Sequence, residues 1–246
     1  MGALAGNRGG EMEVTTTRKV RVADAFPDIL DELDGEQALS ARRLLVAELV
    51  EIPVGSWRPA RDLRHGPGHL GLLVLDGLMT RDVVLDSPLA TELVSRGDIL
   101  RPSDHDGQDA PVPFDIVWQV LEPTRLAVLD RHFAQAAMSW PEVMEALFSG
   151  AVRRAQSLAI GLAVSNIRRV DQRLLALMWY LADRWGKVTP EGVKVPLRLT
   201  HQTLGRLVGA QRPSVSTAVG QLAEDGQLSR APDGTWLLRG EPPAWR

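Results

Sequence analysis

A short run of polar side chains near the C-terminus has the composition that contacts with nucleic acid require. Residues 199–228 have the sequence LTHQTLGRLVGAQRPSVSTAVGQLAEDGQL. The guanidinium of Arg212 can bond two acceptors of a guanine at once. The hydroxyls of Ser214, Ser216 and Thr217 can bond phosphate oxygens or base edges. No acidic residue joins this run before Glu224, so it can approach an anionic groove without repulsion.

The first element that must position these side chains is a helix beginning after Thr200. The Thr200 hydroxyl can accept a hydrogen bond from an unpaired backbone N–H of the first turn, which makes it a good N-cap. Leu204, Leu207 and Val208 fall on one face of this helix. Gly209 is expected to end it, because glycine tolerates the left-handed conformation of a tight turn.

A second helix is predicted over residues 212–222. Pro213 suits its first turn, where a missing N–H costs little. A buried stripe follows at positions i, i+3, i+4 and i+7, formed by Val215, Ala218, Val219 and Leu222. Two short helices joined at a glycine predict a helix-turn-helix, whose second helix fits the major groove of DNA.

Two short strands are predicted after these helices, at residues 227–230 and 235–238. They flank Pro232-Asp233-Gly234, which is a strong turn sequence. Two helices followed by a hairpin are typical of a winged helix, and this context favours DNA binding over the alternative of an ordinary two-helix corner with a solvated outer face.

The charges are divided unevenly along the chain. Residues 1–150 hold 14 Lys and Arg against 24 Asp and Glu, whereas residues 151–246 hold 14 against 7, although the whole chain is at −3. An acidic front and a basic back indicate two domains with different partners. The basic part can neutralise phosphates, so its binding should weaken steeply with salt.

Several function classes are disfavoured by what the sequence lacks. There is no cysteine, which removes disulfides, thiolate catalysis and cysteine-ligated metal clusters. The sequence also has no nucleophile–base pair, phosphate-binding loop or dinucleotide-binding glycine pattern, so we expect neither an enzyme nor a cofactor. No apolar run approaches the ~20 residues of a membrane helix and no secretory signal is visible. These features favour a cytoplasmic protein with no membrane partner.

The front half is predicted to be mostly strands, spaced about ten residues apart and separated by Gly, Pro and Asp. Asp76-Gly77 is taken as a turn between two of them, and residues 103–113 as a loop. This spacing predicts a β-barrel or a jelly-roll-like sandwich. The predicted strands are 70–75, 78–85, 91–94, 99–100, 116–120 and 126–129.

A long helix is predicted from Pro141 to about Arg169, and a further helix from Asp171 to Trp185. An apolar side of the long helix includes Val143, Leu147, Leu158 and Leu162. A long helix between two domains suits a dimer spine, and palindromic DNA sites reward two-fold symmetry. The alternative is a helix that lies across its own β-domain. Residues 193–199 are predicted to form a strand that leads into the helix-turn-helix.

This order of elements, with Thr200-His201-Gln202, Gly205, Leu207-Val208-Gly209, Arg212 and Val215, resembles the Crp/Fnr family of bacterial transcription regulators. In the front domain the resemblance depends on Leu73-Val74-Leu75-Asp76-Gly77 and on Ser95-Arg96-Gly97-Asp98-Ile99-Leu100. These two segments are similar to the strand-and-glycine turn and the later Gly-Asp turn of the cyclic nucleotide-binding fold.

The resemblance implies roles for single residues. Arg212 would contact a base, and Pro213 and Thr217 would face the groove. Pro213 stands where a Glu is common in the family and Thr217 where an Arg is common, so the DNA site is expected to differ from the one most often associated with the family. Phosphate contacts are implied for Thr200, Gln202, Gln211 and Ser214.

The resemblance breaks down at the cyclic nucleotide pocket. The family's cAMP cassette has a Gly-Glu followed by an Arg, whereas this chain continues from Gly97-Asp98-Ile99-Leu100 as RPSDHDGQDAPVPFDIVW. No Arg occurs between Arg101 and Arg125, and the place of Arg101 next to the turn makes it a poor substitute. The acids in the stretch would repel a phosphate, so we expect no cAMP binding. Those acids are Asp104, Asp106, Asp109 and Asp115.

Two groups of possible metal ligands occur in loops. His65 and His69 flank Gly-Pro-Gly, and Asp104-His105-Asp106 follows later. Imidazoles and carboxylates are competent ligands if the loops meet in space. Solvated loops are the favoured interpretation, so no metal site is predicted.

Together these patterns predict an α+β chain: a disordered tail at 1–20, a cyclic nucleotide-binding-like β-roll or jelly-roll-like domain at 21–140, a dimerisation helix at 141–169 and a winged helix-turn-helix domain at 170–246. The predicted function is that of a homodimeric transcription regulator, independent of cAMP, that binds a palindromic promoter site in double-stranded DNA. RNA polymerase is a further candidate partner. The alternative is an allosteric sensor of an unidentified small molecule or cyclic dinucleotide, bound through the β-roll domain.

Overall fold

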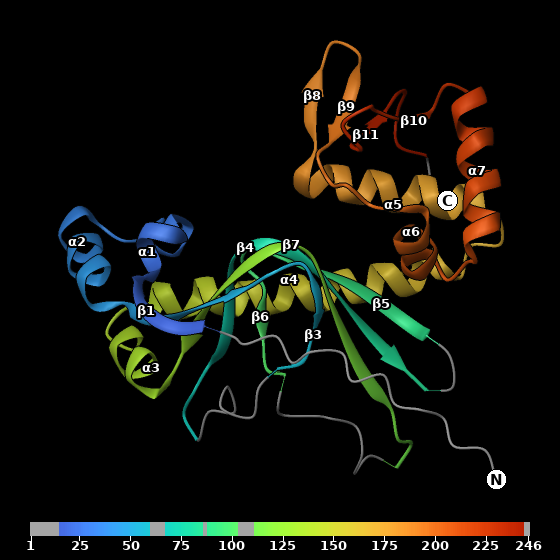
Figure 1. Cartoon of the computed structure of the whole chain (residues 1–246). Helices are drawn as coiled ribbons and strands as arrows, with labels where there is room; N and C mark the ends of the chain where they lie inside the picture. The colour runs from blue at the N-terminus through green and yellow to red at the C-terminus, as the bar shows by residue number, and fades with distance from the viewer. Residues whose placement is uncertain (1–14, 60–66, 86–87, 103–110, 244–246) are drawn as a thin grey trace, which may run out of the picture. The chain divides into compact units, whose positions relative to one another are not determined.

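The computed structural model describes residues 15–59, 67–85, 88–102 and 111–243 (Figure 1). The chain divides into two compact units. The first comprises Met1–Arg81, Val94–Val112 and Val117–Ala151, and the second comprises Asp82–Leu93, Pro113–Ile116 and Val152–Arg246. The second unit therefore includes residues 82–84, 88–93 and 115–116 of the strands described next.

The first unit is built on a sheet in which seven strands are described. The order of its main path is β1-β2-β7-β4-β5, with β3 paired to β7 and β6 paired to β4. The registers given for β1–β2, β2–β7, β3–β7 and β4–β6 are all antiparallel. The strands are β1 (Thr15–Arg21), β2 (Val46–Ile52), β3 (Gly55–Trp57), β4 (Gly71–Val84), β5 (Pro88–Ser95), β6 (Ile99–Leu100) and β7 (Asp115–Leu129).

Two predicted strand breaks are wrong. The segments 70–75 and 78–85 form one strand, β4, which continues through Asp76-Gly77. Gly77 is needed there for a different reason than a hairpin turn: its φ is 100°, and a Cβ would stand 2.5 Å from the Thr124 Cα. The segments 116–120 and 126–129 are likewise one strand, β7, which passes through Pro123.

The start of the described chain also departs from prediction. Residues 15–20, expected to belong to a disordered tail, lie in β1 and pair with β2. The rest of the proposed tail lies outside the described residues. Four short helices of the described chain were not predicted. Three of them follow β1 and the fourth, α3, follows β7, and Figure 1 shows them at one end of the sheet. They are α1 (Val22–Ala25), the 3₁₀ helix η1 (Pro27–Leu30), α2 (Gly35–Leu44) and α3 (Arg131–Ala137).

A single apolar core holds these helices on the sheet. Phe26 and Ile29 pack with strand residues such as Leu73 and Leu75, and with Phe133 of α3. The long helix α4 (Pro141–Ser165) contributes Val143 and Leu147 to the same core, with exposures of 0% and 5%. The first turns of α4 therefore lie across their own β-domain, as the alternative interpretation had it. The helix ends four residues before the predicted Arg169.

The second unit carries the predicted winged helix. Its sheet has four described strands in the order β10-β11-β9-β8. The predicted hairpin strands are confirmed to within one residue, and the predicted strand 193–199 is shorter and pairs with β8, which was not predicted. The elements after α4 are α5 (Val170–Trp185), β8 (Lys187–Thr189), β9 (Gly192–Val195), α6 (His201–Val208), α7 (Arg212–Glu224), β10 (Leu228–Arg230) and β11 (Trp236–Leu238).

The predicted α+β class, with a β-domain, a long helix and a winged helix, is confirmed. None of the helices in the described part of the chain is long and apolar enough to cross a membrane.

Candidate nucleic-acid interface

The first helix of the motif, α6, begins and ends as its sequence predicts. The Thr200 side chain accepts a hydrogen bond from the Thr203 N–H at 3.1 Å, which satisfies one of the unpaired donors of the first turn. Leu204 and Val208 are fully buried. Gly209 follows with φ 62° and ψ 43°, the left-handed conformation that ends the helix.

The turn between α6 and α7 is fixed by a close approach at Gly205. The Ala210 N–H donates to the Gly205 carbonyl at 2.8 Å. A Cβ on Gly205 would stand 2.5 Å from the Ala210 carbonyl oxygen, a distance that real Cβ atoms do not show. A glycine at this position therefore lets the turn lie directly on α6, which sets the angle at which α7 leaves it.

The second helix, α7, buries one stripe and exposes the other side. Pro213 stands in its first turn. Val215, Ala218 and Leu222 are buried, at 0%, 7% and 2% exposure. All eight predicted contact residues are brought onto the surface of α6, the turn and α7, and all eight are exposed. They are Thr200, Gln202, Gln211, Arg212, Pro213, Ser214, Ser216 and Thr217.

Two of the hydroxyls on α7 already make hydrogen bonds within the motif. Thr217 Oγ1 donates to the Pro213 carbonyl at 3.2 Å, so towards a ligand this oxygen is left as an acceptor. Ser216 Oγ lies 2.9 Å from His201 Nδ1. That bond joins the first turn of α6 to the exposed face of α7. His201 was not assigned a role from the sequence, because the contact joins residues 15 positions apart.

The surroundings of His201 favour its neutral form. Burial, followed by the positive charges of Arg230 and Arg212, lowers the pKa of the imidazole below its usual value. The ring centroid lies 6.1 Å from that of Trp236, and the Arg230 guanidinium lies 5.7 Å from the same indole. Arg212 and Arg230 thus make the surroundings of the neutral His201 electropositive.

Arg173 of α5 donates hydrogen bonds to the backbone of the turn. Its Nη1 donates to the carbonyls of Val208 and Gly209, both at 3.1 Å, and its Nε donates to the carbonyl of Ile167. These carbonyls end α6 and precede α5, so one guanidinium ties the two helix ends together. No periodicity in the sequence marks this role.

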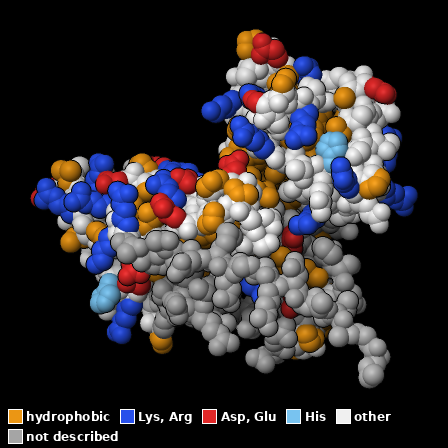
Figure 2. All heavy atoms as spheres, in the orientation of Figure 1, with side chains coloured by type: hydrophobic (Ala, Val, Ile, Leu, Met, Phe, Trp, Pro, Cys, Tyr) orange, Lys and Arg blue, Asp and Glu red, His pale blue; other side chains and the backbone are white. Residues whose placement is uncertain are grey.

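The motif has a charge suited to a polyanion. From residue 192 to 223 the sequence contains no Asp or Glu, while it contains Lys194, Arg198, Arg206 and Arg212. Figure 2 shows Lys and Arg side chains spread over the drawn face of the part that carries α5 to β11. A face with exposed hydroxyls, amides and a guanidinium, and without carboxylates, can take phosphates and base edges.

The residues considered from the sequence for a cyclic nucleotide pocket or a metal site do not belong to the helix-turn-helix. Arg101 is exposed after β6, and Asp115 is exposed at the start of β7. His69 is buried. The remaining residues of those groups, His65, Asp104, His105, Asp106 and Asp109, lie outside the described residues. The part of the chain that is described holds no group of three or more His, Cys, Asp or Glu suited to a metal ion.

Comparisons with known proteins agree with this geometry. Residues 172–239 match the model of the Crp-like helix-turn-helix domain. The global nitrogen regulator of a Synechocystis species is 24% identical over 95 residues, which are 39% of this chain and 42% of that protein. The chain thus matches less than half the length of this relative.

Two solved structures share the fold over most of the chain. A mutant of CooA from Carboxydothermus hydrogenoformans has a TM-score of 0.62 at 17% identity, covering 93% of this chain and 94% of that one. A CRP/FNR-family transcriptional regulator from Thermus thermophilus has a TM-score of 0.53 at 22% identity, covering 78% and 94%.

A β-domain followed by a long helix and a winged helix is the arrangement that the chain shares with these two structures. Residues 172–239 are a Crp-like helix-turn-helix domain, and the rest of the chain is similar in fold to these regulators. The resemblance inferred from the sequence is confirmed. The relatives are regulators and not enzymes, in agreement with the expectation that this chain is no enzyme.

Proposed function

We propose that the protein regulates transcription as a homodimer that places one α7 in each of two successive major grooves of a palindromic promoter site. The observation that carries this proposal is the one-sided exposure of α7: Arg212, Ser214 and Thr217 are exposed while Val215 and Leu222 are buried. Helices of a two-fold dimer would reach half-sites about 34 Å apart. Because the partner is DNA, the proposed location is the cytoplasm.

The proposed roles follow from the chemistry of each side chain. Arg212 stands at the first position of α7, where its guanidinium can reach a guanine edge. Thr217 offers an acceptor oxygen and a methyl group that suits a thymine methyl. Pro213 faces the groove. Thr200, Gln202, Gln211, Ser214 and Ser216 would contact phosphates or base edges.

Selection of bound duplexes from a random DNA pool, followed by fluorescence anisotropy on the selected site, tests this proposal. Arg212→Ala should weaken binding to the selected site by about tenfold or more, since a bidentate base contact is worth about 1–3 kcal/mol. Arg43→Ala, an exposed arginine on α2, is the matched control and should leave binding unchanged. Equal affinity of Arg212→Ala and Arg43→Ala would remove Arg212 from the proposed contacts.

The proposed dimer is supported by an apolar seam on α4. The seam consists of residues at alternating spacings of four and three, the pattern of a coiled coil. Phe148 and Leu162 are 69% and 67% exposed. This set differs from the buried Val143 and Leu147, which serve the protein's own β-domain. The seam residues are Phe148, Val152, Ala155, Ala159 and Leu162.

Light scattering on the purified chain tests the dimer. Val152→Glu places a charge inside the seam and should convert the dimer to a monomer. Gln156→Glu adds the same charge on the same helix outside the seam and should remain dimeric. A chain that is monomeric before any substitution, at concentrations where it binds DNA, would contradict the proposed assembly. RNA polymerase stays a candidate partner of the DNA-bound dimer.

We further propose that cAMP is not the effector of this protein. The sequence lacks the Gly-Glu and Arg of the family's cassette and carries acids in their place. Calorimetric titration should show no heat of cAMP binding. An allosteric sensor of another effector, bound through the β-roll domain, is the alternative proposal.

A further inference from the structure

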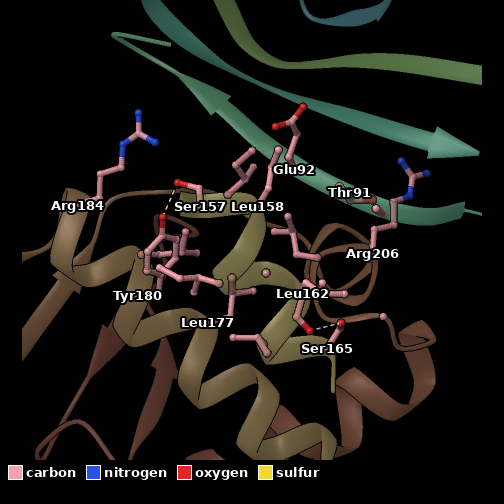
Figure 3. A pocket seen from close by; sticks show the side chains of 18 of the residues that line it. Thr91, Glu92, Ser157, Leu158, Leu162, Ser165, Leu177, Tyr180, Arg184 and Arg206 are labelled. Carbon is pink, nitrogen blue, oxygen red and sulfur yellow. Dashed lines mark hydrogen bonds between the residues drawn. The ribbon is translucent and has the colours of Figure 1, made fainter. Parts of the chain in front are cut away.

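A pocket of about 150 Å³ lies within the second unit (Figure 3). Its walls come from β5, α4, α5 and α6, and all of its lining residues belong to that unit. It is separate from the exposed face of α7. It includes Leu207 and Gly209, which lie at the end of α6 and at the turn of the helix-turn-helix.

Leucine, isoleucine, valine and alanine make up about half of the residues in the wall. Val164, Leu177 and Leu181 are 6%, 6% and 2% exposed, and Leu158 and Ile160 add to the side formed by α4. An apolar cavity of about 150 Å³ engineered in another protein holds one benzene molecule. The volume and lining therefore suit a single six-membered ring or an aliphatic group of that size.

The two carboxylates near this pocket are paired with arginines, and Arg184, also in the wall, has its guanidinium 4.5 Å from the Trp185 ring centroid. Glu92, 7% exposed, accepts two hydrogen bonds from Arg154, at 3.1 and 2.6 Å. Asp82, 5% exposed, accepts from Arg206 Nη1 at 3.0 Å and from Thr91 Oγ1 at 2.6 Å. With both carboxylates neutralised by arginines, the pocket suits an uncharged ligand.

One polar group in the wall, the Tyr180 hydroxyl, can still accept a hydrogen bond. The Ser157 hydroxyl donates its proton to the Arg153 carbonyl at 2.9 Å. The hydrogen bond between Ser157 and Tyr180, drawn in Figure 3, therefore uses the proton of the Tyr180 hydroxyl. Since each hydroxyl has one proton and two lone pairs, the Tyr180 oxygen can still accept a hydrogen bond. A ligand with a hydroxyl or N–H donor would satisfy it.

Gly161 is the residue whose type is hardest to explain without a ligand. It stands inside the 25-residue helix α4, where glycine is less favourable than alanine. No packing requires it, because a Cβ built on Gly161 would meet no atom within 4 Å. Gly161 lines the pocket, so its missing side chain keeps that space open.

We propose that this pocket binds a small uncharged molecule, consisting of one apolar ring with a hydroxyl or N–H donor directed at Tyr180. The ring lies against the leucines of α4 and α5, beside Gly161. Because Leu207 and Gly209 belong to the wall, occupancy is coupled to the affinity of the helix-turn-helix for DNA. This coupling rests on the proposed function, whereas binding of the ring does not.

Ligand-observed NMR titration with two probes, phenol and toluene, tests the site on the full chain without DNA. Phenol should bind saturably at one site and more tightly than toluene, with a Kd of about 1 mM for so small a molecule. Gly161→Leu should abolish binding of both probes by filling the pocket. Gln156→Leu adds the same side chain to α4 outside the pocket and should bind both probes as the unsubstituted chain does.

Tyr180→Phe removes the acceptor and should leave toluene binding unchanged while the preference for phenol is lost. Absence of saturable phenol binding, or binding that Gly161→Leu leaves intact, would overturn the proposal. So would a preference for phenol that survives in Tyr180→Phe.

The coupling to DNA is tested separately by anisotropy with the selected duplex. Saturating phenol should change the Kd for DNA, and saturating DNA should change the Kd for phenol by the same factor. Gly161→Leu should lose the effect of phenol on DNA binding. If phenol binds but no DNA sequence does, the proposed function fails and the pocket stands. If both bind without affecting each other, the coupling is wrong.

Discussion

Substituting Gly205 by alanine should distort the turn that sets the position of α7. The new Cβ would stand 2.5 Å from the Ala210 carbonyl oxygen and 3.5 Å from Val215 Cγ2. The first contact is with backbone, so the turn itself must move. Overpacking of this kind costs about 1–3 kcal/mol. Replacing a helical glycine by alanine recovers about 1 kcal/mol, which leaves a net loss of about 0–2 kcal/mol.

Gly220→Ala is the matched control for this substitution. Gly220 lies inside α7, and a Cβ there would meet no atom within 4 Å, so only the helix preference applies. This variant should gain about 0.5–1 kcal/mol in the free energy of unfolding. Urea unfolding followed by circular dichroism compares the midpoints. A Gly205→Ala protein that unfolds at or above the midpoint of Gly220→Ala would refute the argument from the close approach.

Three further predictions concern residues that hold the helix-turn-helix. Arg173→Ala leaves the carbonyls of Val208 and Gly209 without their donor and should lower the free energy of unfolding by about 2 kcal/mol, measured in urea. Arg206→Ala leaves the buried Asp82 carboxylate without its cation and should also cost about 2 kcal/mol, whereas adding Asp82→Asn should recover part of the loss. The pKa of His201 is lowered in the folded state, so the unfolded chain binds the proton more readily. The free energy of unfolding should therefore fall as the pH drops below about 6.5. Melting temperatures measured over this pH range should fall less in His201→Gln.

The helix-turn-helix could be predicted because its boundaries depend on local chemistry. A capping threonine, a left-handed glycine and a proline in a first turn act within a few residues of where they stand in the sequence. Thr200, Gly209 and Pro213 occupy those positions in the structure. The eight residues proposed to contact DNA are exposed because a helix with a buried stripe must expose its other side.

The first unit was harder to predict because its elements depend on distant contacts. The short helices between β1 and β2 are fixed by Phe26 and Ile29 packing on strands that follow some 45 residues later. Asp76-Gly77 has the sequence of a turn, but β7 lies so close to Gly77 that the glycine serves a close approach within a continuous strand. Tertiary packing overrode the local preference in both places.

The same distinction applies to the contacts that support α6. Asp82 and Arg206 are 124 residues apart, and Arg173 bonds carbonyls 35 and 36 residues away. None of these pairs has a local sequence pattern, so no inspection of the motif alone would find them. None of them is among the eight residues proposed to contact DNA.

Support residues and contact residues should therefore have separable effects on DNA recognition. A change at Arg173 or Gly205 moves the helices as a unit and should weaken binding to all sequences by a similar factor. A change at Arg212 removes a contact to one base and should relax the preference at that position of the site. Repeating the selection from random DNA with Arg173→Ala and Arg212→Ala measures the two effects. If Arg173→Ala altered the sequence preference while Arg212→Ala retained the original one, Arg212 would not be the residue that contacts a base.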